Sequence, residues 1–406
     1  CGAGMAQAVL AQSTTPSSRP PPIPAPQWAS TPPFAPRPLP MPWSWVFFDE
    51  SEGRKPQKSS CEARALALPL CTFAGGPPVA RHLAALSRAW QRAISEVWDE
   101  LTFLFPCRLY VVGGLDTDFR PLSSVNRFDP LTGAWESLPK LPGGTRTGPC
   151  AAVSAGRLFI LGGERRGRAL SDARRFDAWL GKWETLPSMH EGRVRAAAVT
   201  CGGYLYVLGG LDGTRPLRSA ERYDMINRVW EVLPQMHKAR YGGAASVRGH
   251  RIFAIGGDFP EGGGAVSSSI EVYDTQAGRW ELLPALQSPG CGAAVASDST
   301  GRRAFVVGGL GLSGQALGLA RHLLLDRFVC GGAEGEGWSL MPAMPTPRHL
   351  VSVAAFGGGM VAVGGKGATF KATDTVEFFD ADKWAWQVLP PLPSPRMRAA
   401  VVGGRL

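Results

Sequence analysis

A pattern of four features recurs six times between residues 107 and 406, and it constrains the fold more than any other property of the chain. Each unit has an apolar run ending in two glycines, then an aromatic or apolar residue followed by Asp, then a tryptophan, then a Leu-Pro or Met-Pro pair. The first glycines of the pairs are spaced by 49, 47, 47, 52 and 56 residues; they are Gly113, Gly162, Gly209, Gly256, Gly308 and Gly364. A period near 50 residues built from short β segments is typical of a β-propeller.

The chemistry of the repeat fits such a fold. A four-stranded sheet cannot bury both of its faces alone, so each unit must stack on its neighbours. The glycine pair ends a strand where the backbone turns and no side chain fits. The Asp suits a turn because its carboxylate can accept backbone N–H groups. The tryptophans supply large apolar surfaces between the units; they are Trp135, Trp183, Trp230, Trp280, Trp338 and Trp386.

The two ends of the repeat region predict how the ring closes. The first unit lacks the strand that precedes the glycine-pair strand elsewhere, because only LTFLFP stands before RLYVVGG. The chain ends in PRMRAAVVGGRL, which reads as that missing first strand. We therefore expect residues 396–406 to complete the first unit, giving six blades with no open sheet edge between the chain ends.

These motifs resemble the kelch repeat, and the resemblance covers nearly all of residues 107–406. It implies an all-β fold, a six-bladed kelch β-propeller at 106–406 closed by a C-terminal strand. Two departures stand within the repeats. Residues 311–337 lengthen the fifth unit and predict a projecting loop, and the fourth unit has a Gly-rich loop from Asp258 to Ser268.

Two further segments precede the repeats. Residues 1–58 form a Pro-rich tail, with 12 prolines between Pro16 and Pro42, and we expect this tail to be extended and disordered. Residues 59–105 are expected to form a small helical segment, because apolar residues recur at three- and four-residue steps after Pro77-Pro78.

Residues 66–101 resemble the F-box, mainly through Ser87-Arg88-Ala89-Trp90 and the apolar positions around it. The resemblance implies docking on a cullin-adaptor protein, with the propeller holding the substrate of a cullin-RING ubiquitin ligase. The adaptor-binding residues would be Leu83, Leu86, Trp90, Ile94 and Trp98. The alternatives are an amphipathic helix that packs under the propeller, and a kelch scaffold with no ligase link.

One register of arginines is the candidate ligand site. An arginine stands six residues after the proline of four Leu-Pro or Met-Pro pairs, and seven after it in the first; they are Arg146, Arg193, Arg240, Arg348 and Arg396. Arginines converging near the channel mouth would form an electropositive bowl for carboxylates. The kelch resemblance implies an acidic peptide as the ligand, with Tyr241, His349 and Arg195 as secondary contacts. The alternative is that these arginines satisfy loop carbonyls.

Enzyme hypotheses have less support in the sequence. Some kelch propellers are copper radical oxidases or sialic-acid epimerases. The six His and six Tyr show no paired set of the kind the oxidases use, so we assign no catalytic residue, metal ligand or cofactor. A carboxylated sugar would suit the arginine bowl, and an epimerase-like enzyme therefore stays an alternative.

Charge and composition narrow the partner classes. The formal net charge is +10, and residues 106–406 carry 34 basic and 26 acidic residues without a basic run. We therefore expect no nucleic-acid partner. No apolar run reaches the length of a membrane helix, so no membrane partner is expected. The eight cysteines are scattered without a CxxC pair, so a zinc ribbon and a thioredoxin-type site have no support, and a reducing compartment, the cytoplasm or the nucleus, is favoured.

Overall fold

The computed structural model describes residues 107–404, except residues 155, 179, 258–268, 284–292, 299, 312 and 326–337. The chain divides into two units, Cys1–Lys55 and Pro56–Leu406, and the described residues all belong to the second. The Pro-rich tail and the helical segment expected at 59–105 lie outside the described residues. Of the two loops expected to be irregular, 258–268 lies outside them entirely, and the second, 311–337, lies outside them at 312 and 326–337. The described part of the second includes the strand Ala320–Leu324, so this stretch is not loop throughout.

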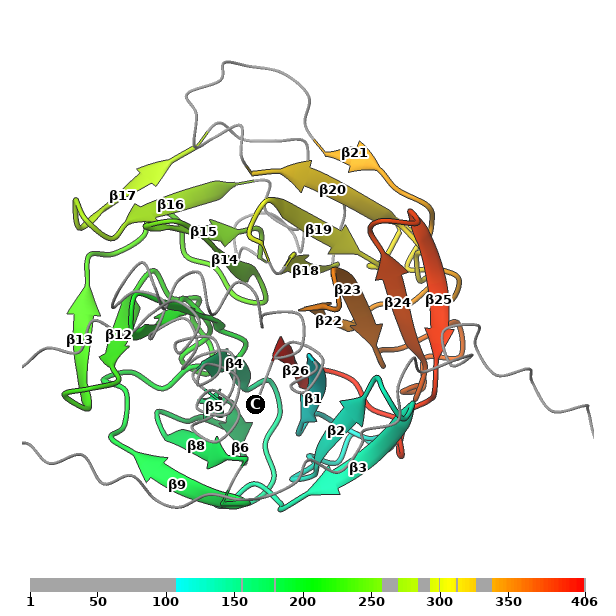
Figure 1. Ribbon diagram of the computed structural model, residues 1–406, viewed down its shortest axis with the longest axis horizontal. Helices are drawn as coiled ribbons and strands as arrows, with labels where there is room; N and C mark the ends of the chain where they lie inside the picture. The colour runs from blue at the N-terminus through cyan, green and yellow to red at the C-terminus, as the bar shows by residue number, and fades with distance from the viewer. Residues whose placement is uncertain are drawn as a thin grey trace, which may run out of the picture. The chain divides into compact units, whose positions relative to one another are not determined.

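The described residues form six four-stranded antiparallel sheets, the blades of a propeller (Figure 1). From the channel outward, blade 1 is β26 (Ala400–Gly404), β1 (Arg108–Val112), β2 (Val125–Asp129) and β3 (Ala134–Leu138). Blade 2 is β4 (Cys150–Ser154), β5 (Arg157–Leu161), β8 (Ala173–Asp177) and β9 (Lys182–Leu186). Blade 3 is β10 (Ala197–Cys201), β11 (Tyr204–Leu208), β12 (Ala220–Asp224) and β13 (Val229–Leu233).

The other three blades repeat this order. Blade 4 is β14 (Ala244–Arg248), β15 (Arg251–Ile255), β16 (Ile270–Asp274) and β17 (Arg279–Leu282). Blade 5 is β18 (Ala294–Ser297), β19 (Arg303–Val307), β20 (Ala320–Leu324) and β21 (Ser339–Leu340). Blade 6 is β22 (Ser352–Phe356), β23 (Gly359–Val363), β24 (Val376–Asp380) and β25 (Ala385–Leu389). A small hairpin, β6 (Glu164–Arg165) with β7 (Arg168–Ala169), lies in a loop of blade 2.

The predicted closure is confirmed. β26 pairs with β1 from Arg108 opposite Gly404 to Val112 opposite Ala400, so the last described strand is the inner strand of the first blade. The chain ends are thereby joined by a ladder of backbone hydrogen bonds, and blade 1 has its full four strands. This removes the open sheet edge that an unclosed ring would leave.

The core lies between the blades. Six apolar clusters each join residues of two neighbouring blades, as in the cluster that packs Phe159 and Leu161 of blade 2 against Leu205 and Val207 of blade 3. The tryptophans also make polar contacts across these interfaces. Trp230 Nε1 donates to the carbonyl of Pro187 at 2.8 Å, and four other blades repeat this bond between a tryptophan and a Leu-Pro or Met-Pro pair. The repeat therefore keeps its Trp and its Pro because they meet across a blade boundary.

The two ends of the channel differ in what they carry. We call loop face the end that bears the loops between the second and third strands of each blade and the connecting loops between blades. Backbone bridges such as His349 to Lys366 and Val194 to Leu211 tie the two kinds of loop together. The opposite end, the turn face, bears the tight turns. There Asp224 Oδ1 accepts the backbone N–H groups of Ile226 and Asn227, as expected for the Asp of the repeat.

Candidate functional site

The five predicted arginines lie in the connecting loops, beneath the surface of the loop face. Their exposure is 3% or less: Arg146, Arg193, Arg240, Arg348 and Arg396. In each case Nη1 donates to the carbonyl of the first glycine of a glycine pair, as from Arg193 to Gly209 at 2.9 Å. The arginine carbonyl in turn accepts the N–H of the second glycine of the preceding blade, as from Gly163 to Arg193 at 2.7 Å. These arginines therefore link blade to blade.

The close approach of this carbonyl explains why the glycine pair recurs. A Cβ atom at the first glycine would lie 2.1 Å from the Arg396 carbonyl oxygen at Gly364 and 2.7 Å from the Arg146 carbonyl oxygen at Gly113. Both glycines also have positive φ angles, 59° and 62°. A side chain at either position would clash with the backbone that the arginine holds.

In four blades the guanidinium group is also bound by a carboxylate near the start of the third strand. The pairs, with their closest printed N–O distances, are Arg146–Asp172 at 2.9 Å, Arg193–Glu221 at 2.7 Å, Arg240–Glu271 at 2.6 Å and Arg348–Glu377 at 2.7 Å. Burial by itself would raise the pKa of Glu221, but hydrogen bonds from Arg193 and His190 bring that pKa below its usual range. In the three pairs with glutamate both side chains are buried, and each charge compensates the desolvation of the other, whereas Asp172 keeps 24% of its side chain exposed.

The electropositive bowl expected from these five arginines is therefore not exposed on the loop face. A guanidinium group that is buried and bonded to a glycine carbonyl and to a carboxylate or amide does not reach a ligand without breaking the blade interface. The arginines instead do what the structural alternative described, since they satisfy loop carbonyls. The binding role predicted for them has no support in these positions.

The last arginine of the set differs from the others. Arg396 closes the ring into blade 1, where the residue at the carboxylate position is Asn126, and its Nη2 donates to Asn126 Oδ1 at 3.0 Å and to Ser394 Oγ at 2.8 Å. Burial lowers the pKa of Arg396 to about 10, because no carboxylate compensates it. Blade 1 thus holds a buried charge that only neutral groups solvate.

A second set of residues, distinct from the five buried arginines, has a strained backbone conformation. Eight non-glycine residues of the described part have φ near +55°, in the left-handed region of the backbone. This conformation costs an L-residue about 1–2 kcal/mol. Six lie on the loop face: Phe119, Arg166, Arg195, Leu350, Phe370 and Arg398. The two on the turn face have partners that account for them, since Arg228 pairs with Glu184 and Trp384 packs on Phe379 and His322.

Arg195 and Arg398 occupy one position of the repeat, two residues after the buried arginine of their blades. Blades 2 and 4 have Gly148 and Gly242 at this position, with φ of 60° and 71°. The position therefore requires a left-handed backbone, and glycine is the residue that adopts it without strain. Two blades nevertheless place an arginine there.

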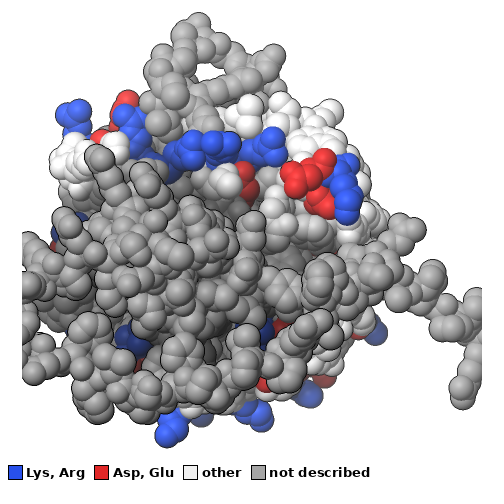
Figure 2. Space-filling model, in the orientation of Figure 1, with Lys and Arg blue, Asp and Glu red and all other residues white. Residues whose placement is uncertain are grey.

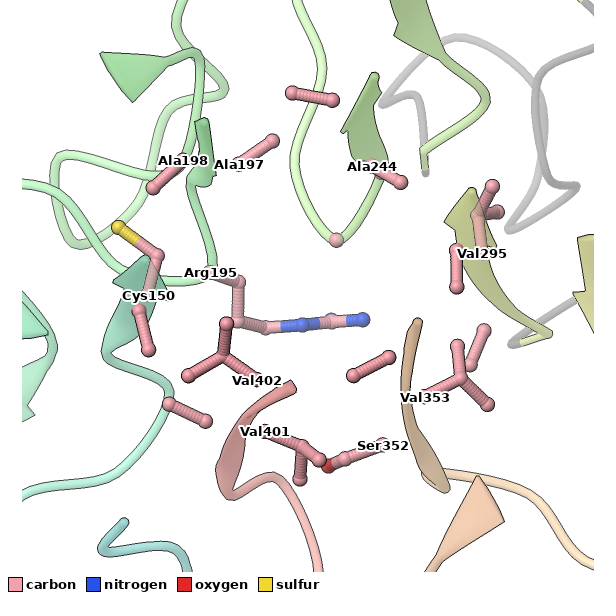
Figure 3. Close-up of a pocket in the computed structure, with 18 of the residues that line it drawn as sticks. Cys150, Arg195, Ala197, Ala198, Ala244, Val295, Ser352, Val353, Val401 and Val402 are labelled. Atoms are coloured by element: carbon pink, nitrogen blue, oxygen red, sulfur yellow. The ribbon is translucent and has the colours of Figure 1, made fainter. Parts of the chain in front are cut away.

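These two arginines are the only charged residues among those lining the central channel in the described part of the chain. The channel has a volume of about 340 Å³ and is otherwise lined mostly by Ala, Val, Gly and Ser. Figure 3 shows the Arg195 side chain reaching inward among Ala197, Val402 and Ser352. Its guanidinium carbon lies 5.0 Å from the ring centroid of Tyr241, which is in the neighbouring connecting loop.

A second group of arginines stands on the same face beside blade 2. The β6–β7 hairpin carries Arg165, Arg166 and Arg168, all exposed, and they line a surface hollow with Gly143 and Gly144 of the connecting loop. Arg165 Nη1 donates to the carbonyl of Gly143. Several acidic groups of these loops are engaged locally: Asp116 and Asp212 accept backbone N–H groups, and Asp118 pairs with Arg120.

The remaining predicted residues fall into two groups. Tyr241 is half-buried against Arg195, and His349 is 6% exposed beneath the loop face. Burial, together with Lys366 and Arg398, lowers the pKa of His349. The residues expected to bind an adaptor, Leu83, Leu86, Trp90, Ile94 and Trp98, lie outside the described residues.

Comparisons with known proteins agree with this architecture. The Kelch motif family model matches residues 105–142, 145–190, 192–237 and 239–287. The described residues form a kelch-repeat β-propeller.

Two human proteins are similar to parts of this kelch chain. Kelch-like protein 33 is 30% identical over 129 residues, which is 31% of this chain and 23% of that protein. Kelch-like protein 35 is 40% identical over 60 residues, which is 15% of this chain and 10% of that protein. The matches thus span less than a quarter of either relative. The match to the solved structure of YjhT covers 69% of this chain and 97% of the YjhT chain. Its TM-score is 0.54 and the sequences are 14% identical, which shows a shared fold.

The surface of the kelch propeller carries its basic residues in several places. Figure 2 shows one face, on which Lys and Arg side chains form a row over blades 4 and 5 with acidic side chains near its ends. Among the described residues no helix is long and apolar enough to span a membrane. In the same part of the chain no three His, Cys, Asp or Glu side chains gather in a way that could hold a metal ion.

The spacing of arginines from the Leu-Pro or Met-Pro pairs did not identify Arg398, the arginines of the β6–β7 hairpin or the strained phenylalanines. A signal for some of them was present in the sequence. Aligning the six units shows which blades have glycine at a given loop position, and a bulky residue in another blade at that position stands out. That comparison needs the loop register, which the structure supplies.

Proposed function

We propose that this chain is a protein-interaction module whose loop face binds an acidic segment of a partner protein. The observation that carries the proposal is the pair Arg195 and Arg398, held in left-handed conformations at the channel mouth, at a position where blades 2 and 4 have glycine and blade 6 has Leu350. Strained backbone conformations cluster at binding sites, where they hold a side chain in the place that the site needs. The Arg165–Arg168 hairpin lies on the same face and extends the positive surface.

Guanidinium groups favour carboxylates because their fork of N–H donors matches both carboxylate oxygens. Arginines that lie both at the channel mouth and on a separate hairpin of the same face suit an extended acidic peptide better than a small ion. The positive field would also accelerate association with an acidic partner.

The test is binding of the full chain to a fluorescent library of acidic peptides. The double variant Arg195→Gly/Arg398→Gly should bind these peptides at least about tenfold more weakly, because each lost charge-assisted contact contributes roughly 1.5–3 kcal/mol. It should remain as stable as the wild type, since blades 2 and 4 already have glycine there. Arg228→Gly is the matched control, because it removes an equally strained arginine from the turn face. Equal loss in the control, or full binding by the double variant, would overturn the proposal.

We further propose that the chain is the substrate receptor of a cullin-RING ubiquitin ligase, acting in the cytoplasm or the nucleus. The support is the F-box-like sequence at 66–101 directly before a kelch propeller. A pull-down of the full chain with purified cullin-adaptor protein tests it, beside the double variant Leu86→Ala/Trp90→Ala. Capture of the wild type alone supports the receptor role. Capture of neither leaves a kelch interaction module without a ligase link.

A further inference from the structure

Two phenylalanines stand exposed at the tips of equivalent loops in neighbouring blades. Phe119 lies between β1 and β2 of blade 1, and Phe370 lies between β23 and β24 of blade 6. Each side chain is 58% exposed, and their φ angles are 60° and 56°. The equivalent residue of the blade 5 loop is Gly314, with φ of 78°.

Neither phenylalanine is explained by the stability of the fold. A left-handed backbone costs a bulky L-residue about 1–2 kcal/mol, and glycine at the same loop position of blade 5 avoids that cost. The rings also leave more than half of their surface in water, so they gain little from burial. Two neighbouring blades thus share a strained backbone conformation at a side chain that stays largely exposed, which points to a role at the surface.

The contacts around the two rings form one continuous strip. Lys366 Nζ lies 4.2 Å from the centroid of the Phe119 ring, so blade 6 supports the tip of blade 1. The backbone of Lys366 is bonded in both directions to His349, at 2.9 and 2.8 Å. The His349 ring packs against the edge of Phe370 with centroids 5.9 Å apart.

This strip is continuous with the channel mouth. Leu350 follows His349, and its carbonyl accepts the backbone N–H of Arg398 at 3.4 Å. Below the strip, Leu115, Ala372 and Met397 form a small apolar cluster that holds both loops from beneath. The rings are therefore mounted on a packed base beside one of the two arginines assigned to the acidic segment.

We propose that Phe119 and Phe370 bind a large apolar side chain of the partner, aromatic or aliphatic, next to its acidic stretch. The inference rests on the proposed function, because the same bound segment would meet Arg398 and the two rings. Lys366 supplies the charge complementarity: its ammonium group at the face of Phe119 favours a carboxylate adjacent to the apolar residue. The motif recognised would thus be an apolar residue neighbouring Asp or Glu, rather than acidic residues alone.

The experiment uses the full chain and a set of Glu-rich fluorescent peptides that differ at one position, which is Gly, Leu, Phe or Trp. The wild type should bind the Leu, Phe and Trp peptides about tenfold more tightly than the Gly peptide, the effect expected of burying part of one apolar side chain. In Phe119→Gly/Phe370→Gly this preference should fall below about twofold, while affinity for the Gly peptide stays the same. The variant should be at least as stable as the wild type, as Gly314 indicates.

A control variant and a second measurement separate the possible outcomes. Leu131→Gly removes an exposed aliphatic residue from a turn of blade 1 and should leave the preference unchanged. If acidic peptides bind without any apolar preference, or the double variant keeps the preference, the inference is wrong and the proposed function stands. If no acidic peptide binds, the proposed function fails. The rings are then tested alone, through the ¹⁹F signals of fluorophenylalanine-labelled chain during titration with N-acetyl-tryptophanamide. Absence of a shift at Phe119 and Phe370 in that titration overturns the inference as well.

Discussion

Blade 6 and blade 1 hold the same arginine of the repeat in two different electrostatic environments. In blade 6 the guanidinium group of Arg348 is bound by Glu377, and neither side chain is exposed at all. In blade 1 the guanidinium group of Arg396 is equally buried but faces Asn126, a neutral amide. The geometry of the repeat is kept in both, so the arginine position is maintained by its carbonyl contacts to the glycine pairs, and the carboxylate is a separate addition.

The buried arginine is therefore less well compensated in blade 1, the closing blade, than in blade 6. A buried cation without a carboxylate loses its hydration and regains only part of it from neutral acceptors. Blade 1 is also the blade assembled from both ends of the propeller sequence, through β26 and β1. The predictions below test how much each feature of that blade contributes.

The largest effect is expected from removing the closing strand. Deletion of residues 397–406 takes away β26 and leaves blade 1 without its inner strand, so the ring opens and the interface with blade 6 is exposed. We expect the free energy of unfolding to decrease by more than about 5 kcal/mol, so that the deletion variant shows no cooperative unfolding transition. Deletion of residues 1–50 removes none of the described strands and should change far less. Circular dichroism during thermal unfolding measures both, and a cooperative transition in the C-terminal deletion would contradict the closure.

The next effect concerns the paired arginine of blade 6. Glu377→Gln keeps the shape of the side chain but gives Arg348 the same kind of neutral partner that Arg396 has. We expect a decrease of about 3–5 kcal/mol in the free energy of unfolding, because one charge of a buried pair is left uncompensated. Glu136→Gln is the control, since the pair Arg127–Glu136 has an exposed carboxylate and should contribute less than about 1 kcal/mol. Equal effects of the two substitutions in urea unfolding would refute the argument.

The reverse change in blade 1 should stabilise the protein. Asn126→Asp supplies a carboxylate within reach of Arg396, and we expect a gain of about 1–2 kcal/mol at neutral pH from the charge-assisted hydrogen bond. The same substitution should raise the thermal midpoint. A lower midpoint would show that the cost of desolvating the new carboxylate exceeds the attraction.

The smallest effect is a pH dependence in blade 3. The pKa of Glu221 in the folded protein is below its usual range, so its contribution to stability is fully present above the pKa of the unfolded chain. That contribution is lost as the pH falls through the lower folded pKa, at about 1.4 kcal/mol for each unit between the two values. The Glu221→Gln variant should therefore have a lower free energy of unfolding than the wild type at pH 7. Between pH 5 and pH 3 its free energy of unfolding should decrease by less than that of the wild type. Parallel stability curves for the two proteins would contradict the assignment.

Much of the fold could be predicted from the repeat alone. The glycine pairs, the Trp and the Leu-Pro or Met-Pro pairs stand at a period near 50 residues, and each makes a contact that recurs from blade to blade, such as that of Trp230 with the Pro187 carbonyl of the neighbouring blade. The closure by the last strand also followed, because the first unit lacked a strand and the last segment had one to spare. These features are periodic, and periodicity is visible without coordinates.

The candidate site could not be predicted in the same way. The sequence shows that Arg193 and Arg195 both lie near the channel mouth, but it does not show that the first points into a blade interface and the second into the channel. Burial depends on the carboxylate of Glu221, which is 28 residues away and is brought close only by strand pairing. The strain at Phe119 and Phe370 likewise depends on backbone angles that loop packing imposes.

The sequence by itself thus determined the number of blades, their order and the closing strand, because each of these depends on a repeated local pattern. The tertiary structure decided which arginines support the ring and which face the channel. Two arginines separated by one residue differ in their backbone conformation and in the partners that distant strands bring to them, and these two properties decide whether a charge is buried between blades or lines the channel.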